Sequence, residues 1–310
     1  MIFKNEMIVL QIVGYVILCI ASIASSVSMN FQKMAQHETD YHDPRTRLRP
    51  RDTKLTTWVA CRPLFIIAIF LSAAASTLDF LALTWLPPIT IGVFGSTSII
   101  INLIVTRVIL FEIPHKKEWT AIGMVIAGCM LSISVTPDEN SSLTPPQLIE
   151  RPQSMAYILL NWIVFITLSQ VLEYQPNIPP VIKKIGFPFL GGALGAQNVC
   201  MGKYIAYAVS TLHSTGTLQC RVDVLVAVVL LCVCSIVVHI AWLNKGLAIH
   251  DAYYCIIVYQ TAWFMFTTLS GVVVYDNMSQ LSGISNVIFI IGFLTAAYGV
   301  WLVSKLHNTA

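Results

Sequence analysis

Long apolar stretches alternate with short polar segments along almost the whole chain. The apolar stretches cover residues 7–29, 58–83, 88–110, 119–136, 155–174, 186–209, 222–244, 252–274 and 284–304. Most of them reach the ~20 residues that a helix needs to cross a hydrocarbon core. Because lipid offers the backbone no hydrogen-bond partner, such a chain must fold as a helix bundle. The pattern predicts an all-α, polytopic membrane protein of about nine transmembrane helices, with residues 1–310 forming one integral membrane domain.

Composition narrows the class of protein further. Hydrophobic residues make up 56% of the 310 residues and charged residues only 11%, which argues against a soluble globular protein and against nucleic-acid binding. The eight cysteines lie mostly inside apolar stretches, where a thiol behaves as a small hydrophobic group. We find no nucleophile with a base, no phosphate-binding glycine loop and no metal-binding pair on one helix face. The sequence therefore predicts neither an enzyme nor a protein with a resident cofactor.

A basic segment at residues 30–56 sets the expected orientation. Its cationic residues are Lys33, Arg45, Arg47, Arg49, Arg51 and Lys54. By the positive-inside rule this segment is a cytoplasmic loop, and counting spans from it places the N-terminus outside and the C-terminus in the cytoplasm. Two glycosylation sequons, at Asn140 and Asn277, then fall in outside loops.

The two halves of the chain resemble each other. The first stretch ends in a polar segment from Ser25 to Lys33, and the sixth contains one from Gly195 to Lys203. Each half continues with a tightly connected pair of stretches and closes with a glycine-bearing one. We interpret 7–136 as a first repeat of four helices, 155–174 as a linker helix and 186–304 as a second, inverted repeat. Transporters built in this way bind substrate near the membrane midplane, between the repeats. The alternative is that two sets of apolar helices simply look alike.

Several short motifs carry a family resemblance. The clearest is Leu243-Asn244-Lys245-Gly246-Leu247, followed by an aromatic and Thr-rich stretch through Gly271. Similar stretches run from Ser25 to Lys33, from Asp79 to Gly95, and from Leu110 through Glu112 towards Gly128. In these places the chain resembles the NIPA-type magnesium transporters, a branch of the drug/metabolite transporter superfamily. The resemblance implies that fold, Mg²⁺ as the transported ion, and a plasma or endosomal membrane; it leaves the oligomeric state open.

The chain departs from that family at positions that matter for ion binding. Where the family has a Thr-Pro and a Ser-Pro pair, this sequence reads Gly92-Val93 and Ile256-Ile257, which removes two points where a helix would open. A Gly-Glu pair becomes Ala75-Ser76, and an Asn one turn further on becomes Asp79. The fold is thus expected to carry over better than the substrate.

Three ionisable residues inside the apolar stretches are candidates for function. A charge at membrane depth is costly, so Asp79 should face the bundle interior or a water-filled cavity. It is a candidate oxygen ligand for Mg²⁺, a proton-binding site, or a structural acid paired with Lys203. His239 is either an interior hydrogen-bonding residue or a group that couples transport to protons. Lys203 is alternatively a site for an anionic substrate.

Neutral polar residues in the spans form the second group of candidates. They are Ser25, Ser26, Asn102, Gln197, Asn198 and Gln260. Such groups often hydrogen-bond between helices with no role in transport. They fall, however, on the four stretches that an inverted repeat brings to its centre, and their oxygens suit a hydrated Mg²⁺.

These observations lead to three hypotheses. The first is a carrier for Mg²⁺ or a related small inorganic cation, working in a lipid bilayer by alternating access. The second is an organic-solute transporter that recognises an anionic group through Lys203 and His239. The third is a scaffold or regulator that does not transport.

Overall fold

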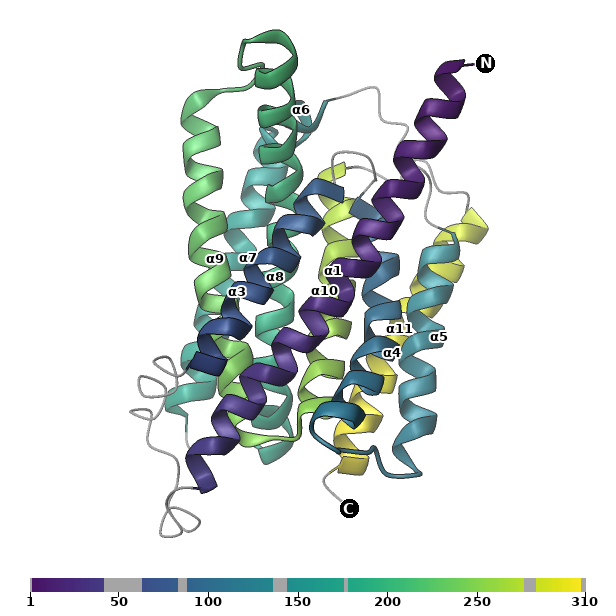
Figure 1. Ribbon diagram of the computed structural model, residues 1–310, viewed down its shortest axis with the longest axis vertical. Helices are drawn as coiled ribbons and strands as arrows, with labels where there is room; N and C mark the ends of the chain where they lie inside the picture. Colours follow the sequence, from purple (N-terminus) through teal and green to yellow (C-terminus); the bar gives the residue numbers. More distant parts are fainter. Residues whose placement is uncertain are drawn as a thin grey trace.

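Figure 1 shows the computed structural model, which describes residues 2–41, 63–82, 88–135, 144–175, 178–275 and 283–307. Every regular element in these ranges is a helix, as the apolar pattern predicts. The helices are α1 (Ile2–Tyr41), α3 (Pro63–Ala82), α4 (Pro88–Ile109), α5 (Glu118–Ser134), α6 (Pro145–Ile149), α7 (Pro152–Tyr174), α8 (Pro180–Thr215), α9 (Val222–Ile249), α10 (Ala252–Tyr275) and α11 (Gly283–His307).

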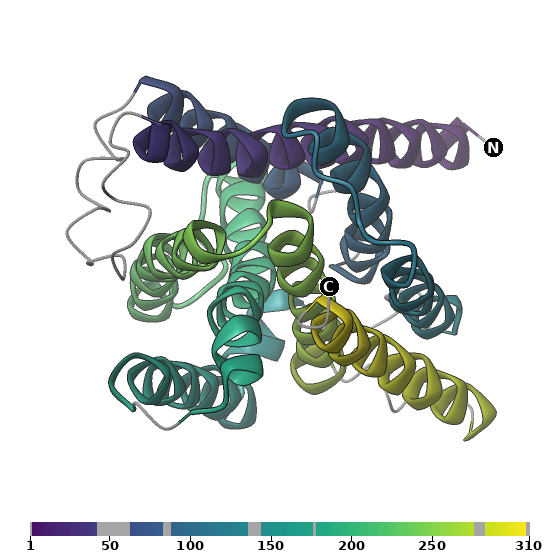
Figure 2. The ribbon, with the colours of Figure 1, turned by 90° about the horizontal axis from the view of Figure 1, so that it is seen from below.

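The helices pack around α10, which lies near the middle of the bundle when it is seen from below (Figure 2). α8 lies between α9 and α10, α1 packs on α3 and α4, and α5 runs along α11. The α8–α10 contact needs glycine at Gly192, because a Cβ there would run into the carbonyl oxygen of Tyr259. α8 and α10 therefore lie close together, and Asn198 of α8 and Gln260 of α10 line the same cavity.

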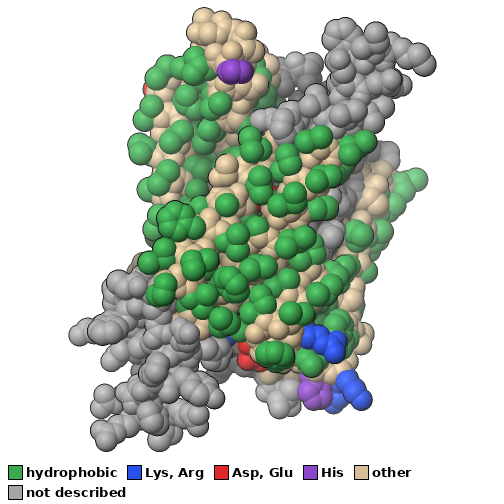
Figure 3. All heavy atoms as spheres, viewed as in Figure 1, with side chains coloured by type: hydrophobic (Ala, Val, Ile, Leu, Met, Phe, Trp, Pro, Cys, Tyr) green, Lys and Arg blue, Asp and Glu red, His purple; other side chains and the backbone are tan. Residues whose placement is uncertain are grey.

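Apolar side chains cover the outside of the bundle, and polar side chains are buried within it. On α9, for example, Val226, Leu230, Val233 and Val237 are all more than half exposed. Figure 3 shows apolar side chains across the middle of one face, with Lys and Arg gathered at its lower end. By contrast, Gln197 is completely buried. A soluble protein rarely exposes so continuous an apolar surface, whereas a surface in contact with lipid requires it.

Six helices in the described part of the chain are long and apolar enough to cross a membrane. They are Ile12–Ala35 within α1, Pro63–Ala82, Pro152–Tyr174, Val222–Ile249, Ala252–Val274 and Gly283–His307. The helices α4, α5 and α8 are not among them. α8 spans 36 residues, but it contains Pro188 and carries several glycine and polar residues. The chain is therefore a polytopic helical membrane protein, while the number of about nine crossings remains a prediction.

The structure moves two of the expected boundaries. Part of the cytoplasmic loop expected at 30–56 is helical, because α1 continues to Tyr41, and residues 42–56 lie outside the described ranges. Its polar residues Asn30, Gln32 and Lys33 are buried against other helices instead of lying in a loop. The sixth apolar stretch, expected at 186–209, is the longer helix α8. The sequons at Asn140 and Asn277 lie outside the described residues.

Candidate functional site

A cavity of about 120 Å³ lies between α1, α3, α4, α8, α9 and α10. We call it the polar cavity, because Ser, Asn, Gln, Asp, His and Tyr side chains make up much of its wall. These are Ser22, Ser25, Gln32, Ser72, Ser76, Asp79, Ser98, Asn198, His239, Tyr259 and Gln260. Five of them, Ser25, Asp79, Asn198, His239 and Gln260, are candidates expected from the sequence. The cavity thus brings together residues from distant parts of the chain, with Ser25 and Gln260 lying 235 positions apart.

α3 contributes a polar stripe to the cavity. Ser72, Ser76 and Asp79 are spaced by four and three residues, so they lie on the same face of the helix. Asp79 is the one carboxylate among the described residues that line the cavity. Ser72 and Ser76 were not expected from the sequence, although their spacing from Asp79 is a signal that would have found them.

α1 and α4 meet at the cavity through two serines. The Ser98 hydroxyl donates to the Ser22 hydroxyl at 3.0 Å. Ser26, next to Ser25 in sequence, turns away: its hydroxyl donates to the carbonyl oxygen of Ser22 in its own helix, at 2.7 Å. Ser25 lines the cavity and Ser26 does not.

His239 of α9 lines the cavity. Its Nδ1 lies 3.1 Å from the carbonyl oxygen of Ser235, and 3.4 Å from the amide nitrogen of Asn198. Because a carbonyl oxygen can only accept and an amide N–H can only donate, the tautomer of the ring decides which of these two contacts is a hydrogen bond. The ring lies close to Tyr259 of α10, with ring centroids 6.4 Å apart.

The remaining candidates lie elsewhere. Gln197 donates to the Ser270 hydroxyl at 3.4 Å, on the side of α8 that meets α7 and α10. Asn102 is buried on α4, and neither of its amide atoms has a hydrogen-bond partner among the described residues. Lys203 is half-buried on α8 and does not line the cavity. The structural pair of Lys203 with Asp79 stays a prediction.

No group of three or more His, Cys, Asp or Glu side chains within the described ranges is placed to hold a metal ion. The cavity offers one carboxylate and several neutral oxygens instead. Such a set can hold a cation that keeps part of its water shell, because the neutral groups accept hydrogen bonds from the bound waters.

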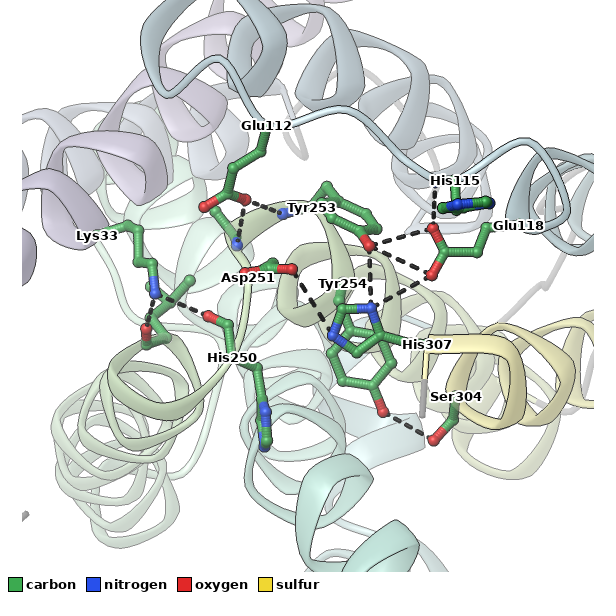
Figure 4. Close-up of polar contacts among 12 residues, drawn as sticks. Lys33, Glu112, His115, Glu118, His250, Asp251, Tyr253, Tyr254, Ser304 and His307 are labelled. Carbon is green, nitrogen blue, oxygen red and sulfur yellow. Dashed lines mark hydrogen bonds and ion pairs between the residues drawn. The ribbon is translucent and has the colours of Figure 1, made fainter. Parts of the chain in front are cut away.

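A second polar cluster lies at the end of the bundle where α9 turns into α10 (Figure 4). Glu118, at the start of α5, is almost completely buried and accepts hydrogen bonds from the His115 backbone N–H at 2.5 Å and from the Tyr253 hydroxyl at 3.1 Å. Nδ1 of His307, near the end of α11, lies 3.2 Å from the same carboxylate. This cluster ties α5, α10 and α11 together, and nothing in the sequence predicted it.

An apolar outer surface around a buried, carboxylate-bearing polar cavity defines an integral membrane protein of the transporter type. The family model for the magnesium transporter NIPA matches residues 8–309, almost the entire chain, so the chain belongs to this family.

Curated relatives are divergent in sequence. The chain is 28% identical to the probable magnesium transporter NIPA4 of Arabidopsis thaliana over 80% of this chain and 71% of that protein. It is 24% identical to the probable magnesium transporter NIPA6 over 80% of this chain and 74% of that protein. For NIPA8 of the same plant the identity is 18%, over 94% of this chain and 69% of that protein. No solved structure matches the chain.

Proposed function

We propose that this protein moves Mg²⁺ or a related divalent cation across a membrane through the polar cavity. The observation that carries the proposal is the position of Asp79, whose carboxylate lies in a cavity otherwise walled by neutral polar and apolar groups. A carboxylate at membrane depth is costly unless it faces such a space, and it attracts cations. Because the relatives are described as probable magnesium transporters, Mg²⁺ is the first ion to test.

The size of the cavity suits an ion that keeps part of its hydration shell. A volume of about 120 Å³ holds several water molecules at roughly 30 Å³ each. Mg²⁺ gives up its waters reluctantly and is usually held by one or two carboxylates. Asp79 would supply the charge, and Ser25, Asn198 and Gln260 would accept hydrogen bonds from the bound waters.

The departure from the family motif supports this role. By the resemblance, the glutamate of the family's Gly-Glu pair falls at Ser76. Ser76 and Asp79 line the same cavity from the same face of α3. The acid is thus moved by one helical turn, not removed from the cavity.

Transport would proceed by alternating access between the two inverted halves, with the N-terminus outside and the C-terminus in the cytoplasm. The membrane potential would drive cation entry with ~2.3 kcal/mol per charge per 100 mV. The organic-solute alternative has less support, since Lys203 lies away from the cavity that His239 lines.

The test is Mg²⁺ uptake into proteoliposomes, read by an internal dye. We expect Asp79→Asn to reduce uptake by about tenfold or more, since losing only 1.4 kcal/mol of cation binding changes affinity tenfold. Asp223→Asn is the matched control, because Asp223 is an exposed acid at the start of α9. Adding Ser76→Glu to Asp79→Asn should restore part of the uptake.

Two results would overturn parts of the proposal. Equal uptake by the parent and by Asp79→Asn would remove Asp79 from the pathway. If folded parent protein moves no divalent cation at all, the cation transporter is rejected and the organic-solute and scaffold hypotheses remain.

A further inference from the structure

Two distant sequence motifs meet at the cavity wall. The Asn244 amide of α9 donates to the Gln32 side-chain oxygen of α1 at 2.9 Å, across 212 positions of sequence. Gln32 and Leu243 both line the polar cavity, so this contact is continuous with its wall. Both motifs belong to the stretches that resemble the family, yet neither Gln32 nor Asn244 was expected to have a role.

Lys33 lies directly beyond this contact. Its side chain is only 5% exposed, and its ammonium donates to the carbonyl oxygens of Leu247 at 2.6 Å and His250 at 2.8 Å. These carbonyls belong to the end of α9, where a helix leaves its last acceptors unpaired and carries partial negative charge. The ammonium therefore fixes the C-terminal part of α1 to the end of α9.

Glu112 holds the other side of the α9–α10 turn. One of its carboxylate oxygens accepts hydrogen bonds from the backbone N–H groups of Ala252 at 2.6 Å and Tyr253 at 3.3 Å, at the start of α10. Lys33 thus caps the negative end of α9, and Glu112 caps the positive end of α10. Figure 4 shows Lys33 and Glu112 on the two sides of this turn.

We propose that Gln32, Lys33 and Asn244 form the gate that closes the polar cavity towards the end of the molecule where α9 turns into α10. This inference rests on the proposed function, because it names the barrier that a cation leaving Asp79 must cross. The barrier is steric, since α1 is fixed against α9, and also electrostatic, since a buried ammonium repels a cation.

The chemistry of the contact suits a gate that opens. A seal made of polar groups can exchange its partners for water when α1 and α9 part, so no group is left unsatisfied in the open state. The ammonium would then move into water and lose its hold on the α9 carbonyls. A static brace is the contrary interpretation, and the two differ in what they predict for access to the cavity.

The test measures access from one side of the membrane. Ser72 lines the cavity on α3, and we take Ser72→Cys, in the full chain in proteoliposomes, as the reporter. A small membrane-impermeant methanethiosulfonate is applied to the face that carries the C-terminus, which an affinity tag identifies. Labelling of the native cysteines is subtracted with the same protein retaining Ser72.

We expect Lys33→Met to raise the labelling rate of the reporter by about tenfold or more, since a lost charged hydrogen bond changes the ratio of open to closed states by that order. Asn244→Ala should raise it by removing the other half of the contact. Lys33→Arg, which keeps the charge and the donors, should label as the parent does.

Lys245→Met is the matched control. Lys245 is the next residue after Asn244, but it pairs with Glu173 at 3.0 Å, near the end of α7. It should leave the labelling rate unchanged. If Lys33→Met and Asn244→Ala are folded and label no faster than Lys245→Met, the contact is a brace and the gate is wrong.

Failure of the gate can be told from failure of the proposed function, because labelling requires no transported ion. Faster labelling in a protein that moves no Mg²⁺ would support the gate and reject the substrate. Normal Mg²⁺ uptake with unchanged labelling would support Mg²⁺ as the substrate and reject the gate.

Discussion

The surroundings of Glu112 favour the neutral form of its carboxyl group. The residue lies in the connection between α4 and α5, and burial raises the pKa of its carboxyl above the ordinary 4.5, with Asp251 adding to the rise. Lys33 and the two N–H groups of α10 act in the opposite direction but do not cancel the effect of burial. The carboxylate thus caps α10 at a net cost in desolvation.

This gives a prediction for the pH dependence of stability. A group whose pKa is raised by folding adds stability below its unfolded pKa and loses it as the pH rises through the folded pKa. Glu112→Gln keeps an acceptor oxygen for the α10 N–H groups but cannot ionise. We expect its melting temperature in detergent, relative to the parent, to rise as the pH increases from 4.5 through the folded pKa of Glu112. A difference that does not change with pH would contradict the assigned cause.

The sequence identifies polar residues inside the bundle, but it does not show which of them line the cavity. A polar residue inside an apolar stretch indicates that some interior face exists, and this was enough to find Asp79, Asn198 and His239. It does not say which face, because adjacent residues on a helix point about 100° apart. Asn198 therefore lines the cavity, while Gln197 bonds to Ser270 on another side of α8.

At the level of helices, α5 offers two glycines in opposite surroundings. A Cβ on Gly128 would meet the backbone nitrogen of Ala296 and lie 2.6 Å from the carbonyl oxygen of Gly292, both on α11. A Cβ on Gly123 would have nothing within 4 Å. Substitutions at the two positions therefore distinguish the effect of close helix packing, at Gly128, from the effect of helix propensity alone, at Gly123.

We expect Gly128→Ala to destabilise the protein by about 1–3 kcal/mol, because the backbone of α11 must shift. Gly123→Ala should be neutral or stabilising by up to ~1 kcal/mol, since alanine is the better helix former. Thermal unfolding in detergent compares the two variants. Equal melting temperatures would mean that α5 and α11 are not in such close contact.

α1 shows why the ends of helices are harder to predict than their existence. The polar run from Asn30 onwards is typical of a segment leaving the membrane, and a loop was expected there. The structure continues the helix, because Gln32 and Lys33 find partners on α9. Those partners are more than 200 positions away, so no local pattern reveals them.

For the whole molecule, the helix contacts follow the order that two repeats would have. α1 packs on α3 and α4, as α8 packs on α9 and α10, and the pairs α4–α10 and α5–α11 join the halves. The apolar pattern predicted an all-helical membrane protein, and the structure and family confirm it. The inverted relation and the count of crossings remain predictions, since α4, α5 and α8 are not among the helices that composition alone identifies as spans.

Polar residues from several connecting segments lie together at one end of the bundle. Lys33, Glu112, Asp251 and His307 lie together at one end (Figure 4). At another site, Glu150 accepts hydrogen bonds from the Tyr204 hydroxyl at 2.9 Å and the Arg221 backbone N–H at 3.3 Å, which joins the segment after α6 to α8 and to the start of α9. The basic residues of the 30–56 segment favour the cytoplasm for the first end.

We therefore expect an epitope at the C-terminus to be stained in cells only after permeabilisation, and one at the N-terminus to be stained without it. Because the sequons at Asn140 and Asn277 should then face the lumen of the secretory pathway, Asn140→Gln and Asn277→Gln should each remove a glycosidase-sensitive shift in mass wherever the site is used. Staining of the C-terminus in intact cells would reverse the orientation. It would also reverse the direction in which the gate formed by Gln32, Lys33 and Asn244 opens, because that gate lies at the same end of the bundle as His307.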